Sequence, residues 1–349
     1  MYRTMHRQPD DLRRIAGEGW DAARRAAELL APARRVFLVG IGTSYHAALA
    51  GEWLFRGAGV DATAVMSFDF ATYPDLYPLR GGDAVVVLAH SGTKTFSTRS
   101  LERAVAAGAT AVSVGSLTAE HPGSQLVLRT VERETSAAFT ASHTAAMYVL
   151  AQVATALAER GGAGVAPALR EGLDALPGLV GDVLAREDEI EDVARDAARR
   201  LIYATGAGPN AVTALEAVIK AREAATAQID ALPLEQFLHG PLVTVNRDDF
   251  AVVVNVAGAT AGAAERTAEI AGVLHRIGTP LWLVGRGAAR APDARVFELP
   301  EVPELLSPIL AVVPAQILAQ RLAVVRGANP DRFRRDDPRY AEAIGSLTL

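Results

Sequence analysis

The chain has 349 residues, of which 50% are hydrophobic and 21% are charged, so it can bury the cores of two domains of ordinary size. Its formal net charge of −5 gives no support to binding of nucleic acid or of a membrane surface. The sequence has no cysteine, which excludes disulfides, thiolate zinc sites and a cysteine nucleophile, and which fits a reducing cytoplasm. The polar N-terminus is not that of a signal peptide, and no apolar run reaches the length of about 18 residues that a membrane-spanning helix needs.

Three apolar segments of the first half recur in the second half, in the same order and at a near-constant offset. Each is a short β-rich run that leads through a turn toward a helix. The pairs are residues 35–44 with 200–209, 83–92 with 249–258, and 109–115 with 280–285. Continuous apolar strands that alternate with helices are typical of parallel sheets covered on both faces. The sequence therefore predicts an α/β protein with two doubly wound αβα domains in tandem.

Helical patterns lie between these strands and at both ends of the repeat. We expect helices over residues 10–30, 44–56, 93–107, 140–159, 209–226, 263–277 and 304–327. Residues 161–199 should be helical and join the halves, and the charge run at 186–192 is interpreted as a solvated helix face. The expected divisions are an N-terminal helical segment (1–30), a first domain (31–185), a second domain (195–328) and an irregular C-terminal tail (329–349).

A glycine turn at Gly40-Ile-Gly-Thr-Ser follows the first predicted strand and opens a helix. Gly42 lets the backbone approach a ligand, and the hydroxyls of Thr43 and Ser44 beside free N–H groups suit an anion such as phosphate. The dinucleotide fingerprint does not fit, because His46 stands where its third glycine would be, and no P-loop lysine follows.

A second polar turn, His90-Ser-Gly-Thr-Lys-Thr, also follows a strand and begins a helix. The residues His90, Ser91, Thr93 and Lys94 could form a phosphate cradle at the helix N-terminus. The alternative is an ordinary helix cap, although capping does not explain a lysine in a chain that has only two. The matching turns of the second half, 206–209 and 255–259, lack the hydroxyl cluster, so we expect the first domain to hold the anion.

Residues 214–223 carry the other lysine. On a helix, Glu216, Lys220 and Glu223 project from one face, and His239 follows in a turn. Two carboxylates, an ammonium and an imidazole can perform general acid/base chemistry. The alternative is a solvated Glu–Lys pair that contributes a few tenths of a kcal/mol. No metal-binding spacing of histidines occurs, no cofactor is expected, and His143 and His275 are interpreted as structural.

Taken together, these residues resemble the SIS (sugar isomerase) domain superfamily, in particular the isomerase half of glucosamine-6-phosphate synthase and its free-standing relatives. The resemblance covers nearly the whole chain. Its motifs are Arg7-Gln-Pro, Gly42-Thr-Ser-Tyr, Ser91-Gly, Glu134…Thr140…Thr144, Ala214-Leu-Glu…Lys220…Glu223, His239-Gly-Pro and Val302-Pro-Glu…Val313-Pro-Ala-Gln.

The resemblance implies two αβα units with five-stranded parallel sheets and a homodimer with shared active sites. It also implies that Thr43, Ser44 and Ser91 hold a sugar phosphate, and that Thr140 belongs to a substrate loop. Glu223 matches the base that moves a proton between C1 and C2, and Lys220 matches a lysine near the reacting carbons. His239 matches a ring-opening histidine that reaches into the neighbouring subunit's site.

Three departures from the family pattern narrow the expected reaction. The usual Ser-Gln-Ser-Gly-Glu-Thr loop reads Ala89-His-Ser-Gly-Thr-Lys, so the phosphate contacts are partly rewritten. Gly345 stands where the synthase has an imine-forming lysine, and the chain has neither a glutaminase domain nor a cysteine to serve one, so glutamine-dependent amination is not expected.

We therefore expect a cytoplasmic phosphosugar enzyme that acts on a small sugar phosphate and has no nucleic-acid or membrane partner. Its reaction would be aldose–ketose isomerisation, or deamination or deglycation of an amino-sugar phosphate, through an enediol or enolamine. The alternatives are a non-catalytic sugar-phosphate sensor and an isomerase of an unphosphorylated or unusual sugar in a biosynthetic pathway.

Overall fold

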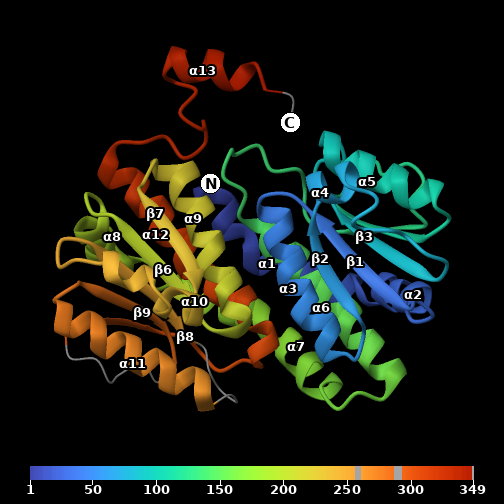
Figure 1. Cartoon of the computed structure of the whole chain (residues 1–349), viewed down its shortest axis with the longest axis horizontal. Coiled ribbons are helices and arrows are strands. Elements are labelled where there is room, and N and C mark those ends of the chain that lie inside the picture. The colour runs from blue at the N-terminus through green and yellow to red at the C-terminus, as the bar shows by residue number, and fades with distance from the viewer. Residues whose placement is uncertain (256–260, 287–292, 348–349) are drawn as a thin grey trace. The chain divides into compact units, whose positions relative to one another are not determined.

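The computed structural model describes residues 1–255, 261–286 and 293–347. It divides into two compact units, each built around its own parallel sheet (Figure 1). The β1–β5 unit comprises Arg7–Thr135, Phe139–Pro177 and Ala343–Leu349, and the β6–β10 unit comprises Met1–His6, Ser136–Ala138 and Gly178–Glu342. Each unit is thus assembled from several stretches of chain, whereas the expected domain divisions were continuous.

The β1–β5 unit has five parallel strands in the order β2-β1-β3-β4-β5. The strands are β1 (Arg35–Gly40), β2 (Ala62–Met66), β3 (Asp83–Leu88), β4 (Thr110–Gly115) and β5 (Leu126–Arg129). The helices along this part of the chain are α1 (Tyr2–Glu18), α2 (Trp20–Leu30), α3 (Thr43–Gly57), α4 (Ser67–Thr72), α5 (Thr95–Ala106), α6 (Ala141–Gly161) and α7 (Ala166–Leu184).

Both faces of this sheet are covered, as the apolar strands predict. On one face Phe37, Val85 and Val87 pack with Phe70 of α4 and Leu101 of α5. On the other face α3 packs against β1 and against α6, and α6 in turn packs against α2.

The β6–β10 unit repeats this architecture with the order β10-β9-β8-β6-β7, again all parallel. Its strands are β6 (Ile202–Gly206), β7 (Ile229–Pro233), β8 (Phe250–Asn255), β9 (Leu281–Gly285) and β10 (Arg295–Glu298). Its helical segments are η1 (Glu187–Ile190), α8 (Glu191–Ala197), η2 (Gly208–Asn210), α9 (Ala211–Ala225), α10 (Leu234–Leu238), η3 (Pro241–Thr244), α11 (Ala261–Ile277), η4 (Glu304–Leu306) and α12 (Ser307–Arg326).

The repetition extends from strands to helices. A core that includes Leu234, Phe237, Ile270 and Leu274 covers one face of this sheet from α10 and α11, and α9 and α12 pack together on the other. When the strands of each unit are numbered from its own first strand, the two sheets have the same strand order. A helix also follows the equivalent strands in both units. The predicted α/β fold with two doubly wound five-stranded sheets is confirmed. The predicted turn at 255–259 lies, after Asn255, outside the described residues.

Three predictions of local structure were wrong. The first helix does not begin at residue 10 but at Tyr2, with Pro9 inside it, and a break at Gly19 separates α1 from α2. At Gly19 a β-carbon would lie 2.5 Å from Oε1 of Gln152, which explains the absence of a side chain there. The tail was expected to be irregular, yet Pro338–Gly345 forms the helix α13. The charge run forms η1 and the start of α8 with Asp188 and Asp192 exposed, as expected.

One helical stretch in the described residues, Glu304–Arg326, is long and apolar enough to cross a membrane by length and composition. Its apolar residues are interrupted by polar ones, so the sequence did not mark it as a membrane-spanning candidate. Of its most apolar window, 78% is buried inside the protein. Burial of this kind is typical of a core helix, and α12 packs against α9 and α8 in the β6–β10 unit.

Candidate active site

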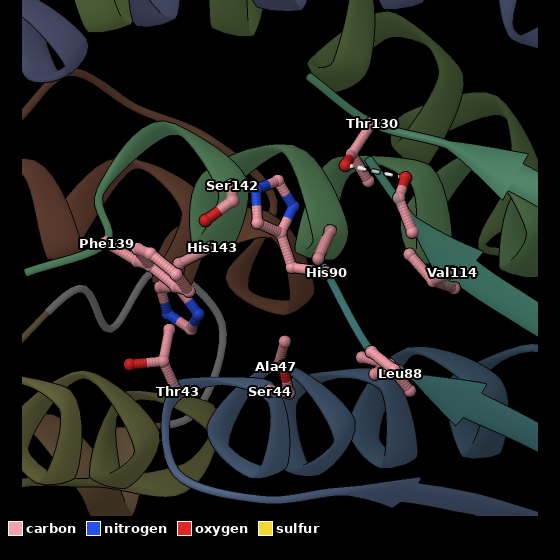
Figure 2. A pocket seen from close by; sticks show the side chains of 13 residues that line it. Thr43, Ser44, Ala47, Leu88, His90, Val114, Thr130, Phe139, Ser142 and His143 are labelled. Carbon is pink, nitrogen blue, oxygen red and sulfur yellow. Dashed lines mark hydrogen bonds between the residues drawn. The ribbon is translucent and has the colours of Figure 1, made fainter. Parts of the chain in front are cut away.

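A pocket with both polar and apolar lining lies at the carboxyl ends of the strands of the β1–β5 unit (Figure 2). Its walls come from the start of α3, the ends of β3 and β4, the residue after β5, and the start of α6. The lining residues are Thr43, Ser44, Ala47, Leu88, Ala89, His90, Val114, Gly115, Thr130, Phe139, Ser142, His143 and Ala146.

The strand order explains this location. From β1 the chain passes to the edge strand β2, and from β3 it passes toward β4 on the other side. The turns after β1 and β3 therefore separate, and open α/β sheets bind their ligands at such a switch point. The two hydroxyl-rich turns predicted from the sequence are these two turns.

Two glycines shape the turn after β1. A β-carbon at Gly40 would lie 2.4 Å from the carbonyl oxygen of Ser44, so only glycine lets α3 start this close to the strand. Gly42 has φ +58°, a left-handed conformation that glycine adopts without strain. The turn thereby directs the N-terminus of α3, with Thr43 and Ser44, toward the pocket.

The turn after β3 holds the second hydroxyl pair. The Ser91 and Thr93 hydroxyl oxygens lie 3.1 Å apart, and Gly92 has φ +71°. Lys94 is exposed and occupies the N-cap position of α5. In the described residues no side chain caps α5, so the alternative of an ordinary serine or threonine cap is wrong.

A buried carboxylate organises the opposite wall. Glu134 accepts hydrogen bonds from the Thr140 N–H (3.1 Å), the Ser142 N–H (2.9 Å) and the hydroxyls of both residues. Burial would raise the pKa of Glu134, but these bonds outweigh it and leave the pKa below its usual value. Thr140 is fully buried at the N-cap of α6 and fixes the segment that carries Phe139 and Ser142.

His90 connects the two walls. Its Nε2 lies 3.2 Å from the backbone nitrogen of Glu134, and its ring meets that of Phe139 edge-on at 5.3 Å. Burial lowers the pKa of His90 below its usual value, against the attraction of Glu134.

In the β6–β10 unit, α9 carries the predicted charge cluster. Lys220 Nζ lies 2.6 Å from Glu223 Oε2 and 3.5 Å from Glu216 Oε1. The side chains of Lys220 and Glu216 are each 1% exposed, whereas that of Glu223 is 27% exposed. The common helix face is confirmed, and the alternative of a solvated pair is wrong. Glu223 is the member of the cluster that a ligand can reach.

The turn after β6 has the same shape as the turn after β1 but different chemistry. A β-carbon at Gly206 would lie 2.3 Å from the carbonyl oxygen of Asn210, and Gly208 has φ +55°. Asn210, however, is buried and donates to Ser307 Oγ at 2.7 Å. A Glu304 oxygen lies 3.4 Å from the β-carbon position of Gly208. A carboxylate beside this turn disfavours a second anion.

His239 follows α10 and is 70% exposed. Its Nε2 lies 2.9 Å from Glu235 Oε1. An ion pair with Arg266, together with His239, lowers the pKa of Glu235 to about 2, so Glu235 is ionised at neutral pH.

The predicted residues thus form two groups. In the β1–β5 unit, Thr43, Ser44 and His90 line one pocket, with Gly42, Ser91, Thr93 and Lys94 in the same turns and Thr140 buried behind its wall. In the β6–β10 unit, Lys220 and Glu223 are in contact on α9, and His239 lies after α10. Sequence reasoning missed the lining residues Thr130, Phe139, Ser142 and His143. His143 was interpreted as structural because a lone histidine in an apolar helix carries no motif. In the described ranges no cluster of three or more potential ligands could hold a metal.

The family model of the SIS domain matches residues 29–156. The chain carries a SIS domain. It is 29% identical over 339 residues to glutamine–fructose-6-phosphate aminotransferase (isomerizing) of Pyrococcus horikoshii, covering 96% of this chain and 56% of that protein. The chain therefore spans about half the length of the curated relatives it matches. The resemblance drawn from the motifs is confirmed.

Solved structures that share the fold of this chain include the following two. The C-terminal domain of glucosamine-fructose-6-phosphate aminotransferase from Francisella tularensis has a TM-score of 0.86 at 19% identity, with 95% of this chain and 97% of that chain covered. Glucosamine-6-phosphate deaminase from Thermotoga maritima has a TM-score of 0.70 at 19% identity, with 92% and 97% covered.

Proposed function

We propose that this protein is a phosphosugar enzyme of the isomerase type. It would interconvert an aldose phosphate and a ketose phosphate, or remove the amine from an amino-sugar phosphate. The observation that carries the proposal is the α9 cluster, in which a buried Lys220 holds the partly exposed carboxylate of Glu223 at 2.6 Å. Curated relatives with sugar phosphates in their names support the substrate class.

In the proposed mechanism Glu223 is the base. Its carboxylate takes the proton from the carbon beside the carbonyl while the carbonyl oxygen takes a proton from solvent, which gives an enediol, or an enolamine when the substrate carries an amine. In the second half of the reaction the other hydroxyl or amine releases a proton to solvent as the new double bond to carbon forms. Returning the proton to the neighbouring carbon gives the isomer, and protonating an enolamine gives an imine that water hydrolyses to ketone and ammonia. Lys220 orients Glu223 from behind and keeps that carboxylate charged, so that it can act as the base.

The two turns of the β1–β5 unit are the proposed phosphate site. Hydroxyls of Thr43, Ser44 and Ser91 and backbone N–H groups at the helix starts would donate to phosphate oxygens. Lys94 would add a charge from the start of α5. His239, exposed beside its turn, is proposed to open the sugar ring in the site of a partner subunit of a homodimer.

A panel experiment tests this function. The purified protein is incubated in D₂O with hexose 6-phosphates and their 2-amino forms, and NMR follows deuterium entry at C2 and product formation. Glu223→Gln should fold and bind ligand but lose at least about two orders of magnitude in turnover, the scale of a positioned base. The exposed Glu265→Gln on α11 is the matched control and should keep full activity.

Lys94→Ala separates binding from chemistry in the same assay. Loss of a charge-assisted contact should weaken phosphosugar binding by roughly 10- to 100-fold, and should leave turnover at saturation close to wild type. Near-normal turnover of Glu223→Gln would refute the assignment of the base. Ligand binding without deuterium exchange in the wild type would favour a sugar-phosphate sensor, and turnover of unphosphorylated sugars alone would favour the unusual-sugar isomerase.

A further inference from the structure

His90 lies where two pocket walls meet. It follows β3, so it belongs to the turn that carries Ser91 and Lys94. Through its Nε2 it contacts the backbone of Glu134, whose carboxylate holds Thr140 and Ser142 at the start of α6. One imidazole therefore bridges the proposed phosphate turn and the segment that carries Phe139.

The contact fixes the protonation state of the ring. A backbone N–H can only donate, so Nε2 must accept, and the ring proton of the neutral form must lie on Nδ1. Nδ1 is buried, with no hydrogen-bond partner in the described residues. A second proton on Nε2 would point at the Glu134 N–H and break the bond.

We propose that His90 is a positioning residue, whose unprotonated Nε2 holds the Glu134 wall against the Ser91 turn, so that substrate binding weakens when the ring is protonated. The inference rests on the proposed function, because it takes this pocket as the phosphosugar site. It goes beyond that function in assigning an acid-sensitive brace between the Ser91 turn and the Glu134 wall.

The charged groups that face His90 agree with this role. Burial lowers its pKa, Arg133 and Arg7 lower it further, and only Glu134 raises it. The Glu134 carboxylate already accepts bonds from Thr140 and Ser142, so it is poorly placed to receive a new imidazolium proton. His143, from α6, lines the same pocket. His90 is therefore neutral at pH 7, and the brace is lost only as the pH falls through the lowered pKa.

Two substitutions separate the brace from mere packing. In His90→Gln the side-chain carbonyl reaches about as far as Nε2 and accepts from the Glu134 N–H at every pH. In His90→Leu the apolar volume is kept and the acceptor is removed. Hydrogen exchange of the Glu134 amide reports the contact without any ligand, and calorimetric titration with fructose 6-phosphate between pH 5 and 8 reports its effect on binding.

We expect the Glu134 amide to be protected at pH 7.5 in the wild type and in His90→Gln but not in His90→Leu. At pH 7.5 His90→Leu should bind fructose 6-phosphate about fivefold more weakly, the scale of one hydrogen bond. Toward pH 5 the affinity of the wild type for fructose 6-phosphate should fall relative to that of His90→Gln. The ratio of the two affinities cancels the titration of the sugar phosphate itself, which is the same for both proteins.

Four results would overturn the inference. One is equal protection of the Glu134 amide in wild type and His90→Leu, and another is the same acid loss of affinity in wild type and His90→Gln. The second comparison decides the matter even if the leucine variant fails to fold. A wild type that binds no fructose 6-phosphate at any pH would count against the proposed function as well, whereas normal binding by His90→Leu would refute the brace alone.

Discussion

Lys220 is the residue whose environment says most about function. Its ammonium is removed from water and held between Glu216 and Glu223. A buried ion pair of this kind adds little stability, because desolvation costs about as much as the attraction returns. A buried Leu or Met would pack at lower cost, so stability does not explain a lysine here. Orientation of the partly exposed Glu223 does.

His121 provides a test of electrostatics away from the proposed chemistry. It lies in the loop after β4, only 8% exposed, against Gly115. Burial, with a smaller effect of Arg129, lowers its pKa to about 4. The folded protein therefore binds this proton less readily than the unfolded chain. The stability linked to neutral His121 is fully present above the unfolded pKa of about 6.5, and is lost as the pH falls toward 4.

Replacing His121 should flatten this dependence. We expect His121→Leu to reduce the loss of unfolding free energy between pH 7 and 4 by up to about 3 kcal/mol, from roughly 2.5 pKa units at 1.36 kcal/mol each. Urea unfolding at several pH values measures it. Parallel pH profiles for wild type and His121→Leu would contradict the argument.

At the scale of elements, the paired turns after β1 and β6 show what the fold requires. Both have a first glycine in backbone contact with the following helix and a second with positive φ, although their other residues differ. The shared conformation belongs to the architecture. The hydroxyls of Thr43 and Ser44 on one side, and Asn210 with Glu304 on the other, give the two turns different chemistry.

Gly40→Ala should show the strength of this requirement. Its β-carbon would come within 2.4 Å of the Ser44 carbonyl, so α3 must shift. We expect a loss of about 1–3 kcal/mol in stability, the usual range for overpacking, together with weaker sugar-phosphate binding. Gly178→Ala, in α7 with open space at its β-carbon, should instead stabilise by about 0.5–1 kcal/mol. Thermal unfolding of both variants makes the comparison, and equal melting temperatures would count against the close-approach argument.

The elements also show which parts of the fold the sequence could predict. The inner strands β1, β3, β8 and β9 are buried along their length, so they read as unbroken apolar runs. The edge strands β2, β5, β7 and β10 are partly exposed, and residues such as Asp230 interrupt their pattern. Sequence periodicity alone does not separate such edges from loops.

The same distinction applies to the candidate site. Ser44 and Ser91, in turns that follow strands, and Lys220, on α9, were found because their residue types and spacing are unusual. Phe139, Ser142 and His143 were missed because their contribution depends on how the start of α6 folds around Glu134. A hydrogen-bond network between residues far apart in sequence leaves no local pattern.

For the whole molecule, the two halves of the repeat share a fold but carry different functional-type side chains. The β1–β5 unit keeps hydroxyls and a cation at its turns, and the β6–β10 unit carries the carboxylate–lysine cluster. His239 lies in the second of these units and is 70% exposed. Four residues further on, Val243 is 88% exposed, an apolar side chain that another subunit could cover. The proposal that His239 completes the neighbouring site of a homodimer belongs to this scale.

Subunit mixing tests that assembly. Glu223→Gln and His239→Ala proteins, each inactive alone, are mixed and allowed to exchange subunits, with exchange followed by mass spectrometry of differently tagged chains. If sites are shared, each mixed dimer has one site with both groups intact, and an equal mixture should recover about a quarter of wild-type activity. Mixing either variant with itself is the control and should recover nothing. If exchange is demonstrated and activity stays absent, each site is built within one chain, and His239 acts in its own subunit or only closes its turn.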